Sequence, residues 1–503
     1  MSRPTRSLSL FDCICIGING IVGSGIYLLI APLAKLAGYA SVIGILTCGL
    51  LCILIGLCFA ELSGMFDENG GPYIYARAAY GPYIGFVVGW MAMSTGILGW
   101  SAVAVGFSEA LAKLVPWFAT VVYRGGSFAL SLKTFVAVGL IGTLGLINYF
   151  GVKAGARTSD FLSITKILPL LVLGLVGLAH VRPEVLSGMF STQSIPGEPV
   201  TYVHAISSSA FLAVFMISGF EYVPVPAGET TNAKRNVPLA LVSSLAGATL
   251  LYCLIQTVAL STVPDLYARE QPLMEVAGRI FGRPGVSILG LASLVSMAGF
   301  CSSTALVGPR YFTALAADRY LPAVFTARSR FQTPGPAIAL STGLALLLAF
   351  FLGYGSLVDV SNVALFCQYI PTCLAVVALR YRRPQAHRTY RLPGGPIIPL
   401  TGAGISTVLL VMARPKSKEW MFAAEVLALG ILIWVSTALL RRLLVRRGAA
   451  GAAKVSSNAS QGNPLARAVR RCRRRQSKRL CAVLEIRGGC SSVRPGRGDR
   501  RRL

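Results

Sequence analysis

The fold is decided by one stretch near the N-terminus, Gly17-Ile18-Asn19-Gly20-Ile21-Val22-Gly23-Ser24-Gly25-Ile26-Tyr27. It lies within an apolar run, residues 11–32, that is long enough to cross about 30 Å of hydrocarbon as a helix. Closely spaced glycines weaken a helix at mid-membrane, where non-helical backbone is tolerated only if protein or a water-filled cavity covers it. The stretch therefore predicts a transmembrane helix with an interruption that lines a cavity.

A second interrupted segment lies in the sixth apolar run and reads Phe215-Met216-Ile217-Ser218-Gly219-Phe220-Glu221-Tyr222, followed by Pro224 and Pro226. Gly219 corresponds to Gly23 of the first run if the chain folds as two halves of five helices. Interrupted segments at corresponding positions of two halves are the best sequence pointer to a transporter binding site.

Two such interruptions suit a zwitterionic substrate. Amides at Ser24 and Gly25 could take a carboxylate at a positive helix terminus, and carbonyls from Phe215 to Ser218 could take an ammonium group. Close packing of glycines between membrane helices is the alternative interpretation. The predicted substrate-binding residues are Ile21, Gly23, Ser24, Gly25, Phe215, Met216, Ile217, Ser218 and Gly219.

The composition of the whole chain agrees with a membrane protein. Its 503 residues are 54% hydrophobic and 13% charged, against about a quarter charged in soluble domains. Continuous apolar runs without strand alternation predict an all-α integral membrane protein with twelve transmembrane helices. We expect these near residues 11–32, 40–62, 82–112, 132–150, 157–180, 203–228, 238–261, 285–315, 335–353, 357–380, 397–413 and 421–440.

Lys and Arg in the short loops set the expected orientation. The loops around residues 150–157, 228–238 and 380–396 are richer in them than the loops on the other side. Both termini are therefore expected in the cytoplasm, in a multi-pass protein of the plasma or bacterial inner membrane. The first run has no Ala-x-Ala-like cleavage site, which predicts a retained helix and not a signal peptide.

Much of the net charge of +28 lies in residues 448–503, which hold fifteen Lys and Arg against Glu485 and Asp499. This composition predicts a basic, disordered cytoplasmic tail that cannot form a core. Binding to anionic lipid or nucleic acid is the alternative, and so is translation past the natural end of the gene. We expect no nucleic-acid partner, because charge runs at termini are usually solvated.

The cysteines and histidines show no pattern typical of a metal site. Nine of the twelve cysteines fall within predicted helices, and His180, His204 and His387 stand singly. No nucleophile and base pair appears in the apolar runs. We therefore expect no metal, no cofactor and no enzyme activity.

Several motifs together resemble the amino acid/polyamine/organocation permeases over about residues 8–440. They are Gly23-Ser24-Gly25-Ile26; Glu61-Leu62-Ser63 with Asn69-Gly70-Gly71-Pro72-Tyr73, Tyr80-Gly81-Pro82, Gly85 and Gly89-Trp90; Gly228-Glu229-Thr230 with Asn232 and Lys234-Arg235-Asn236-Val237-Pro238; Arg310 with Ala314-Leu315-Ala316, Asp318 and Leu321-Pro322; Tyr381-Arg382-Arg383-Pro384; and Tyr390-Arg391-Leu392-Pro393-Gly394-Gly395-Pro396. Arg319 departs from the pattern, since a glycine is usual there, and this puts the local loop geometry in doubt.

The resemblance implies the leucine-transporter-like fold, a 5+5 inverted repeat plus two C-terminal helices, with alternating access. It implies a permease domain over residues 1–447, with repeats at about 8–180 and 202–381 and extra helices at about 397–440. It also implies a substrate held between helices one, three, six, eight and ten. Phe215, Trp90, Trp100 and Phe300 are candidate walls of that site.

Charged residues at membrane depth are costly and are functional candidates. Lys166 resembles a lysine that in several such permeases lies against the broken first helix, where sodium-coupled relatives bind sodium; a bridge to backbone carbonyls is the alternative. Glu221 matches an acidic residue of proton-linked relatives, and a hydrogen bond that staples the broken helix is its alternative. Both are predicted coupling residues, whereas Glu109 is expected near the outer interface.

The sequence favours a secondary active transporter of amino acids, with membrane lipid around it and protons as one coupling ion. The small, apolar candidate lining favours neutral amino acids. Basic amino acid or polyamine antiport and a non-transporting nutrient sensor on the same fold remain the alternatives, and symport is not separated from exchange. A channel is disfavoured because the distinctive residues lie in two non-identical helices, with no repeated filter.

Overall fold

Helices make up most of the chain that the computed structural model describes, namely residues 6–125, 128–191, 195, 200–412, 421–422, 424–437 and 439. The predicted tail, 448–503, lies outside these residues. The helices are α1 (Leu10–Ile21), α2 (Gly25–Leu28), α3 (Ile30–Ala37), α4 (Ser41–Ser63), α5 (Pro72–Tyr80), α6 (Pro82–Leu114), α7 (Leu132–Phe150), α8 (Val152–Gly177), α9 (Pro183–Gly188), α10 (Tyr202–Ile217), α11 (Ala233–Thr262), α12 (Pro272–Ala317), α13 (Gly335–Phe351), α14 (Tyr354–Arg382) and α15 (Ile397–Met412).

Nine stretches of the described residues are long and apolar enough to cross a membrane. Three shorter apolar helices, Gly335–Phe351, Ile397–Val408 and Ala424–Thr437, occupy the ranges predicted for the ninth, eleventh and twelfth spans. The total of twelve spans stays a prediction. The nine are Leu10–Leu28, Ile30–Ser63, Pro82–Leu114, Leu132–Phe150, Val152–His180, Tyr202–Tyr222, Ala233–Thr262, Pro272–Ala317 and Ala364–Arg382.

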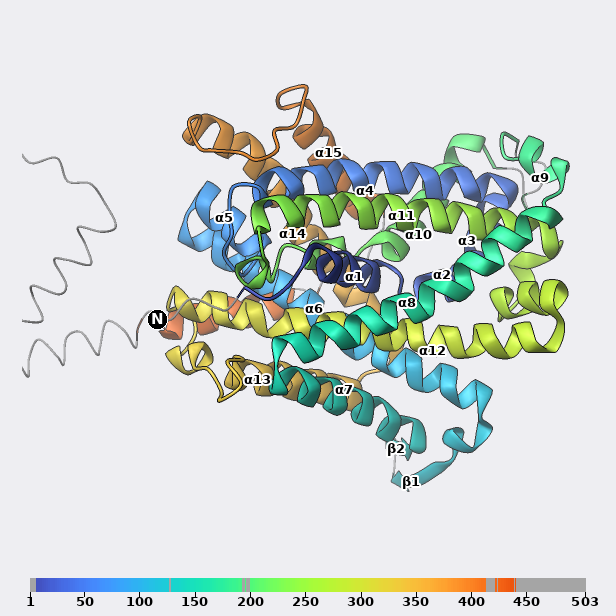
Figure 1. Ribbon diagram of the computed structural model, residues 1–503, viewed down its shortest axis with the longest axis horizontal. Helices are drawn as coiled ribbons and strands as arrows, with labels where there is room; N and C mark the ends of the chain where they lie inside the picture. The colour runs from blue at the N-terminus through green and yellow to red at the C-terminus, as the bar shows by residue number, and fades with distance from the viewer. Residues whose placement is uncertain are drawn as a thin grey trace, which may run out of the picture. The chain divides into compact units, whose positions relative to one another are not determined.

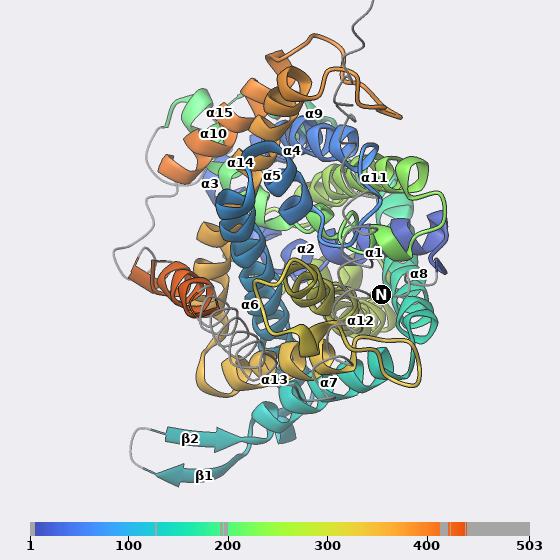
Figure 2. The ribbon, with the colours of Figure 1, turned by 90° about the vertical axis from the view of Figure 1, so that its left-hand side faces the viewer.

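The chain divides into two units, Met1–Trp434 and Val435–Leu503, and helices α1 to α15 all belong to the first. Within it, α6 packs against α12 and α14, and α4 packs against α10 and α11. Figure 1 shows α4 and α11 running side by side, while Figure 2 shows α6 between α14 and α12. The first described residue, Arg6, pairs with Asp67 shortly before α5, at one end of these long helices, and α9 lies at the opposite end (Figure 1).

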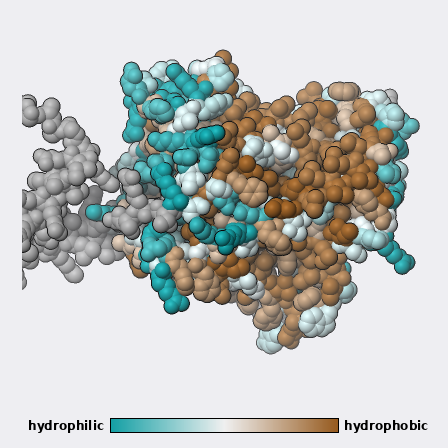
Figure 3. All heavy atoms as spheres, viewed as in Figure 1, coloured by the Kyte–Doolittle hydropathy of each residue, from teal (hydrophilic) through white to brown (hydrophobic). Residues whose placement is uncertain are grey.

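Apolar side chains cover the middle of the face seen in Figure 3, and hydrophilic residues gather toward its two ends. Helix α8 shows the underlying pattern. Phe161, Leu168 and Leu175, spaced two turns apart on one face, are 60–67% exposed, whereas Ser163 and Lys166 on the other face are buried. Such an exposed apolar stripe is stable against lipid and would be costly in water.

The first transmembrane segment is interrupted where the sequence predicts it. Ser9 and Asp12 form a capping box at the start of α1, and α1 ends at Ile21 because Val22 leaves the helical conformation (φ −82°, ψ 83°). Helix α2 begins at Gly25. The sixth segment breaks as well: α10 ends at Ile217, Ser218 is extended, and Gly219 adopts a left-handed φ of 111°.

Two elements differ from the predicted pattern of spans. A short antiparallel hairpin, β1 (Val121–Gly125) with β2 (Phe128–Ser131), joins α6 to α7, and Val121 pairs with Ser131. Helix α12 begins at Pro272, before the predicted start at 285, and bends at Gly282 (φ 69°). Apolar runs of about twenty residues do not predict the hairpin or the early start of α12, because both lie in connections between spans.

Arg319 takes the conformation that the usual glycine would take. Its φ is 64°, and its amide and that of Tyr320 close the end of α12 by donating to Ala316 and Leu315, both at 2.9 Å. This is the geometry of a helix C-terminus capped by a left-handed residue. The turn therefore forms despite the arginine. A side chain in the left-handed backbone region costs a modest amount of conformational free energy.

Candidate functional site

A cavity of about 40 Å³ lies where the two interrupted segments meet. We call it the central cavity. The first segment, the sixth segment, α6, α12 and α14 all contribute to its wall. Its lining residues are Gly20, Ile21, Gly23, Ser24, Gly25, Thr95, Gly99, Ala102, Val103, Phe215, Ser218, Gly219, Glu221, Tyr222, Phe300, Ser361 and Leu365. This volume holds a small number of water-sized groups, and polar atoms lie among apolar walls.

Glycines allow the two interruptions to touch. A methyl group on Gly20 would stand 2.5 Å from the carbonyl oxygen of Gly219, and one on Gly25 would stand 2.8 Å from the side chain of Met216. Real side chains do not approach this closely, so any larger residue must push the segments apart. The glycines thus bring both broken backbones to one cavity.

The carbonyls at the end of α1 are held by side chains from three other helices. Lys166, fully buried on α8, donates from Nζ to the Val22 carbonyl. Ser296 Oγ donates to Val22 at 3.0 Å and to Gly23 at 2.9 Å, and the Tyr252 hydroxyl donates to Ile21 at 3.0 Å. These donors replace the helical hydrogen bonds lost at the interruption.

The start of α2 faces the cavity. The first hydrogen bonds of this turn run from the amides of Tyr27 and Leu28 to the Ser24 carbonyl, both at 3.1 Å. The amides that precede them in a helix have no partner within it. The Ser24 hydroxyl is bonded to the hydroxyl of Tyr354 on α14 at 3.1 Å.

Glu221 is buried beside the sixth-segment break. Its Oε2 atom accepts hydrogen bonds from the Gly219 amide at 2.9 Å and from the Tyr369 hydroxyl at 2.8 Å. The carboxyl group therefore joins the broken segment to α14 and also lines the cavity. This is the geometry of the alternative in which Glu221 holds the broken helix together by hydrogen bonds. The same carboxyl group can also bind a proton.

The structure brings most of the predicted site residues together, but not all. Met216, Ile217 and Lys166 are buried outside the lining of the central cavity, while Trp90 donates to the Val426 carbonyl at 2.8 Å and Trp100 packs in the core. Phe300 lies in the wall as expected. The lining residues that were not predicted are Gly20, Thr95, Gly99, Ala102, Val103, Tyr222, Ser361 and Leu365. Gly20 and Tyr222 lie in the two interrupted stretches, and the others carry no local signal beyond lying in apolar runs.

Sequence motifs far apart in the chain meet at the N-terminal end of the bundle. Glu229 pairs with buried Arg310 at 2.7 Å and accepts from Asn69 at 3.2 Å, while its carbonyl accepts from the Ser7 and Leu8 amides. Close by, Asp318 accepts hydrogen bonds from Tyr73 and Arg77. Burial raises the pKa of the Tyr73 hydroxyl, so it stays a donor. These contacts join α12 to α5 and to the segments that follow α4 and α10.

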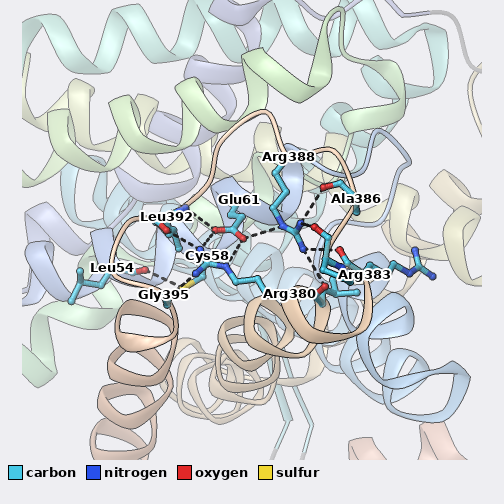
Figure 4. Close-up of polar contacts among 11 residues, drawn as sticks. Leu54, Cys58, Glu61, Arg380, Arg383, Ala386, Arg388, Leu392 and Gly395 are labelled. Atoms are coloured by element: carbon cyan, nitrogen blue, oxygen red, sulfur yellow. Dashed lines mark hydrogen bonds and ion pairs between the residues drawn. The ribbon is translucent and has the colours of Figure 1, made fainter.

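A second buried ion cluster joins α4 to the end of α14 and the loop after it (Figure 4). Glu61 Oε1 accepts from Arg380 Nε at 2.9 Å, Oε2 accepts from Arg380 Nη2 at 2.5 Å, and Arg388 lies at 3.3 Å. The Leu392 amide also donates to Oε2 at 2.8 Å. A two-pronged arginine pair of this kind fixes geometry as well as charge.

The described part of the chain holds no group of three or more His, Cys, Asp or Glu side chains that could bind a metal ion. Nine cysteines are free there, and they are buried or half-buried. The chemistry that the central cavity offers is therefore hydrogen bonding by backbone, hydroxyls and one carboxyl group.

This arrangement agrees with the comparison to known families, in which residues 8–440 match the family described as amino acid permease. The chain belongs to the amino acid permease family. The permease is a multi-pass membrane transporter. Several of the motifs that carried the resemblance meet around Glu229 and Glu61, while Gly23-Ser24-Gly25 lines the central cavity.

Three relatives from Bacillus subtilis (strain 168) show the range of the family. The permease is 27% identical to a methylthioribose transporter, over 85% of this chain and 92% of the relative. It is 24% identical to a branched-chain amino acid permease, over 78% and 85%, and 24% identical to an aspartate-proton symporter, over 84% and 82%. These names differ in substrate, so relatedness at this level identifies a transporter without identifying its cargo.

Proposed function

We propose that the permease is a secondary active transporter of neutral amino acids that works by alternating access. The observation that carries the proposal is the central cavity at the contact of two broken segments. Ser24 and Gly25 present a helix start to a substrate carboxylate, and the backbone from Phe215 to Ser218 presents carbonyls to its ammonium group.

The lining supports a neutral side chain. Glu221 is the one acidic residue in the lining, and its Oε2 atom already accepts hydrogen bonds from the Gly219 amide and the Tyr369 hydroxyl. A cationic side chain would need a further carboxylate or an open aromatic face. Basic amino acid or polyamine antiport is the second candidate, because Glu221 could exchange its partners for a cation, and a nutrient sensor without flux is the third.

The helix contacts support the inverted repeat of five and five helices. α6 packs on α14 as α12 packs on α8, and α4 packs on α10 as α11 packs on α1. If each of the first five spans is replaced by its counterpart among the second five, and the reverse, the α6–α14 contact becomes the α12–α8 contact. The α4–α10 contact becomes the α11–α1 contact in the same way. We propose on this basis the leucine-transporter-like arrangement over residues 1–447, in the cell membrane, with both termini in the cytoplasm.

Uptake by proteoliposomes tests the function. A panel of labelled neutral, acidic and basic amino acids and polyamines is offered with and without an inward proton gradient, and with and without internal substrate. We expect saturable uptake of neutral amino acids. Gly25→Val should abolish substrate binding while the protein remains folded in detergent, because the added side chain meets Met216. Uptake restricted to polyamines, or binding without flux, would favour the second or third candidate.

A further inference from the structure

A second cavity, of about 90 Å³, lies at the end of the bundle opposite the N-terminus. Its wall includes Tyr27, Glu109, Lys113, Glu270, Met297 and Tyr354, and we call it the outer cavity. Glu109 and Lys113 come from the last turns of α6, and Glu270 comes from the connection between α11 and α12. Its polar rim and position are those of an entrance to the transport path.

Two hydroxyl groups stand between the cavities. Ser24 lines the central cavity and Tyr354 lines the outer one, and their hydroxyls are hydrogen bonded at 3.1 Å. The Tyr354 ring rests against Gly106 of α6, where an added methyl group would stand 3.1 Å from a ring carbon. The ring is therefore placed by packing, and its hydroxyl reaches the start of α2 from another helix.

We propose that Tyr354 is the outer gate of the permease and that its bond to Ser24 closes the central cavity on that side. The proposal rests on the proposed function. A substrate that passes from the outer cavity to the central one must part the two hydroxyls, which frees Ser24 to face the bound carboxylate. The gate thus opens at the Ser24 hydroxyl group, which the substrate carboxylate then contacts.

The Tyr354–Ser24 hydrogen bond is weaker than the contacts at the N-terminal end of the bundle. A single neutral hydrogen bond shifts a two-state equilibrium by about two- to tenfold. At the N-terminal end, by contrast, buried Glu229 and Arg310 form an ion pair at 2.7 Å, and backbone hydrogen bonds add to it. Breaking a buried pair costs more than breaking a neutral bond. The outer gate should therefore open first and more often.

Thiol labelling tests the gate without any substrate. Ala102→Cys places a reporter in the central cavity, and none of the nine described native cysteines lines either cavity. A membrane-impermeant thiol reagent is added at the outer side of vesicles that hold this variant alone or combined with Tyr354→Phe. We expect Tyr354→Phe to label about two- to tenfold faster, because it removes only the hydroxyl.

Tyr27→Phe is the matched control, since Tyr27 also lines the outer cavity and its hydroxyl makes no hydrogen bond to Ser24 in the described structure. It should label at the parent rate. The double variant Ser24→Ala/Tyr354→Phe should label no faster than Tyr354→Phe, because both remove the same bond. Gly106→Ala, which displaces the ring, should accelerate labelling by a second route.

Equal labelling rates with and without the Tyr354 hydroxyl would overturn the gate, and so would equal acceleration by Tyr27→Phe. Thermal unfolding in detergent checks that each variant folds. The labelling assay needs no substrate. If Tyr354→Phe accelerates labelling but the permease transports no amino acid, only the proposed function is refuted. Amino acid uptake with unchanged labelling would refute only the gate.

Discussion

Gly20 and Gly219 lie with backbone against backbone, so that the break in the first segment rests directly on the break in the sixth. A methyl group on either residue would overlap the carbonyl group of the other, and Gly219 has a φ of 111° that other residues rarely adopt. Neither interruption is therefore an independent defect of its helix. Together they form the backbone floor of the central cavity.

Gly219→Ala should lower substrate binding at least tenfold and reduce the temperature of thermal unfolding in detergent. Overpacking alone costs about 1–3 kcal/mol, and the left-handed backbone adds strain. Gly139→Ala is the matched control, because a methyl group on this glycine of α7 would meet nothing within 4 Å. Full binding by Gly219→Ala, measured by scintillation proximity, would contradict the shared floor.

Lys166→Ala should weaken transport at every pH from 5 to 8. The side chain supports the Val22 carbonyl at the end of α1, so its loss leaves that support to Ser296. Lys166→Met, which keeps the length of the side chain without the donor, should weaken transport equally. Wild-type uptake should be the same in sodium and in choline buffers, since an amino group already fills this position. Sodium-dependent uptake by the wild type would argue against that role.

Glu61→Ala should destabilise the fold more than the loss of any single exposed ion pair. It leaves two guanidinium groups, 12% and 6% exposed, without their carboxylate, at a cost of about 3–5 kcal/mol. Arg380→Lys should not preserve stability, because lysine cannot bond both carboxylate oxygens in the same way. Asp265→Ala, which removes an exposed partner of Arg269, should cost about 1 kcal/mol or less. Thermal unfolding in detergent compares the three.

Truncation after Arg447 should leave transport per folded molecule within about twofold, because a terminal segment without an apolar face adds little to a core. The expectation comes from the composition of residues 448–503. Uptake normalised to the amount of folded protein is the measurement. A large loss of flux at normal expression would give the basic tail a function in transport.

The positions of the two breaks could be predicted because glycine and proline act locally on the backbone. The depth of Lys166 followed from its place within an apolar run. Which residues of a helix face the cavity could not be predicted, since this depends on packing between segments far apart in sequence. Phe215, Ser218 and Gly219 line the cavity, whereas Met216 and Ile217 lie on the other side of the same turn.

Tyr354 shows the same limit more sharply. It lies between two predicted spans, 335–353 and 357–380, where a tyrosine is usually taken as an interfacial residue. Only the fold brings it within hydrogen-bonding distance of Ser24, 330 positions earlier in the chain. Partners of this kind carry no signal in a single sequence, because neither residue is unusual in its own segment.

Glu221 allows the sharpest test of coupling, because its carboxyl group joins the broken sixth segment to α14 and lines the cavity. Glu221→Gln keeps an oxygen that can accept from the Gly219 amide and from the Tyr369 hydroxyl, but it cannot release a proton. If Glu221 carries the coupled proton, exchange of substrate for substrate should persist in this variant. Uptake driven by an inward proton gradient should collapse and lose its dependence on pH.

Tyr369→Phe separates this role from a purely structural one. It removes one hydrogen bond from Glu221 and leaves the carboxyl group able to bind and release a proton. Exchange and gradient-driven uptake should then fall together, by about two- to tenfold, with the pH profile retained in shape. The paired measurement is exchange and gradient-driven uptake in proteoliposomes from pH 5 to 8. Full gradient-driven uptake by Glu221→Gln with the wild-type pH profile would leave Glu221 as a staple of the broken segment, and the coupling would have to be sought elsewhere.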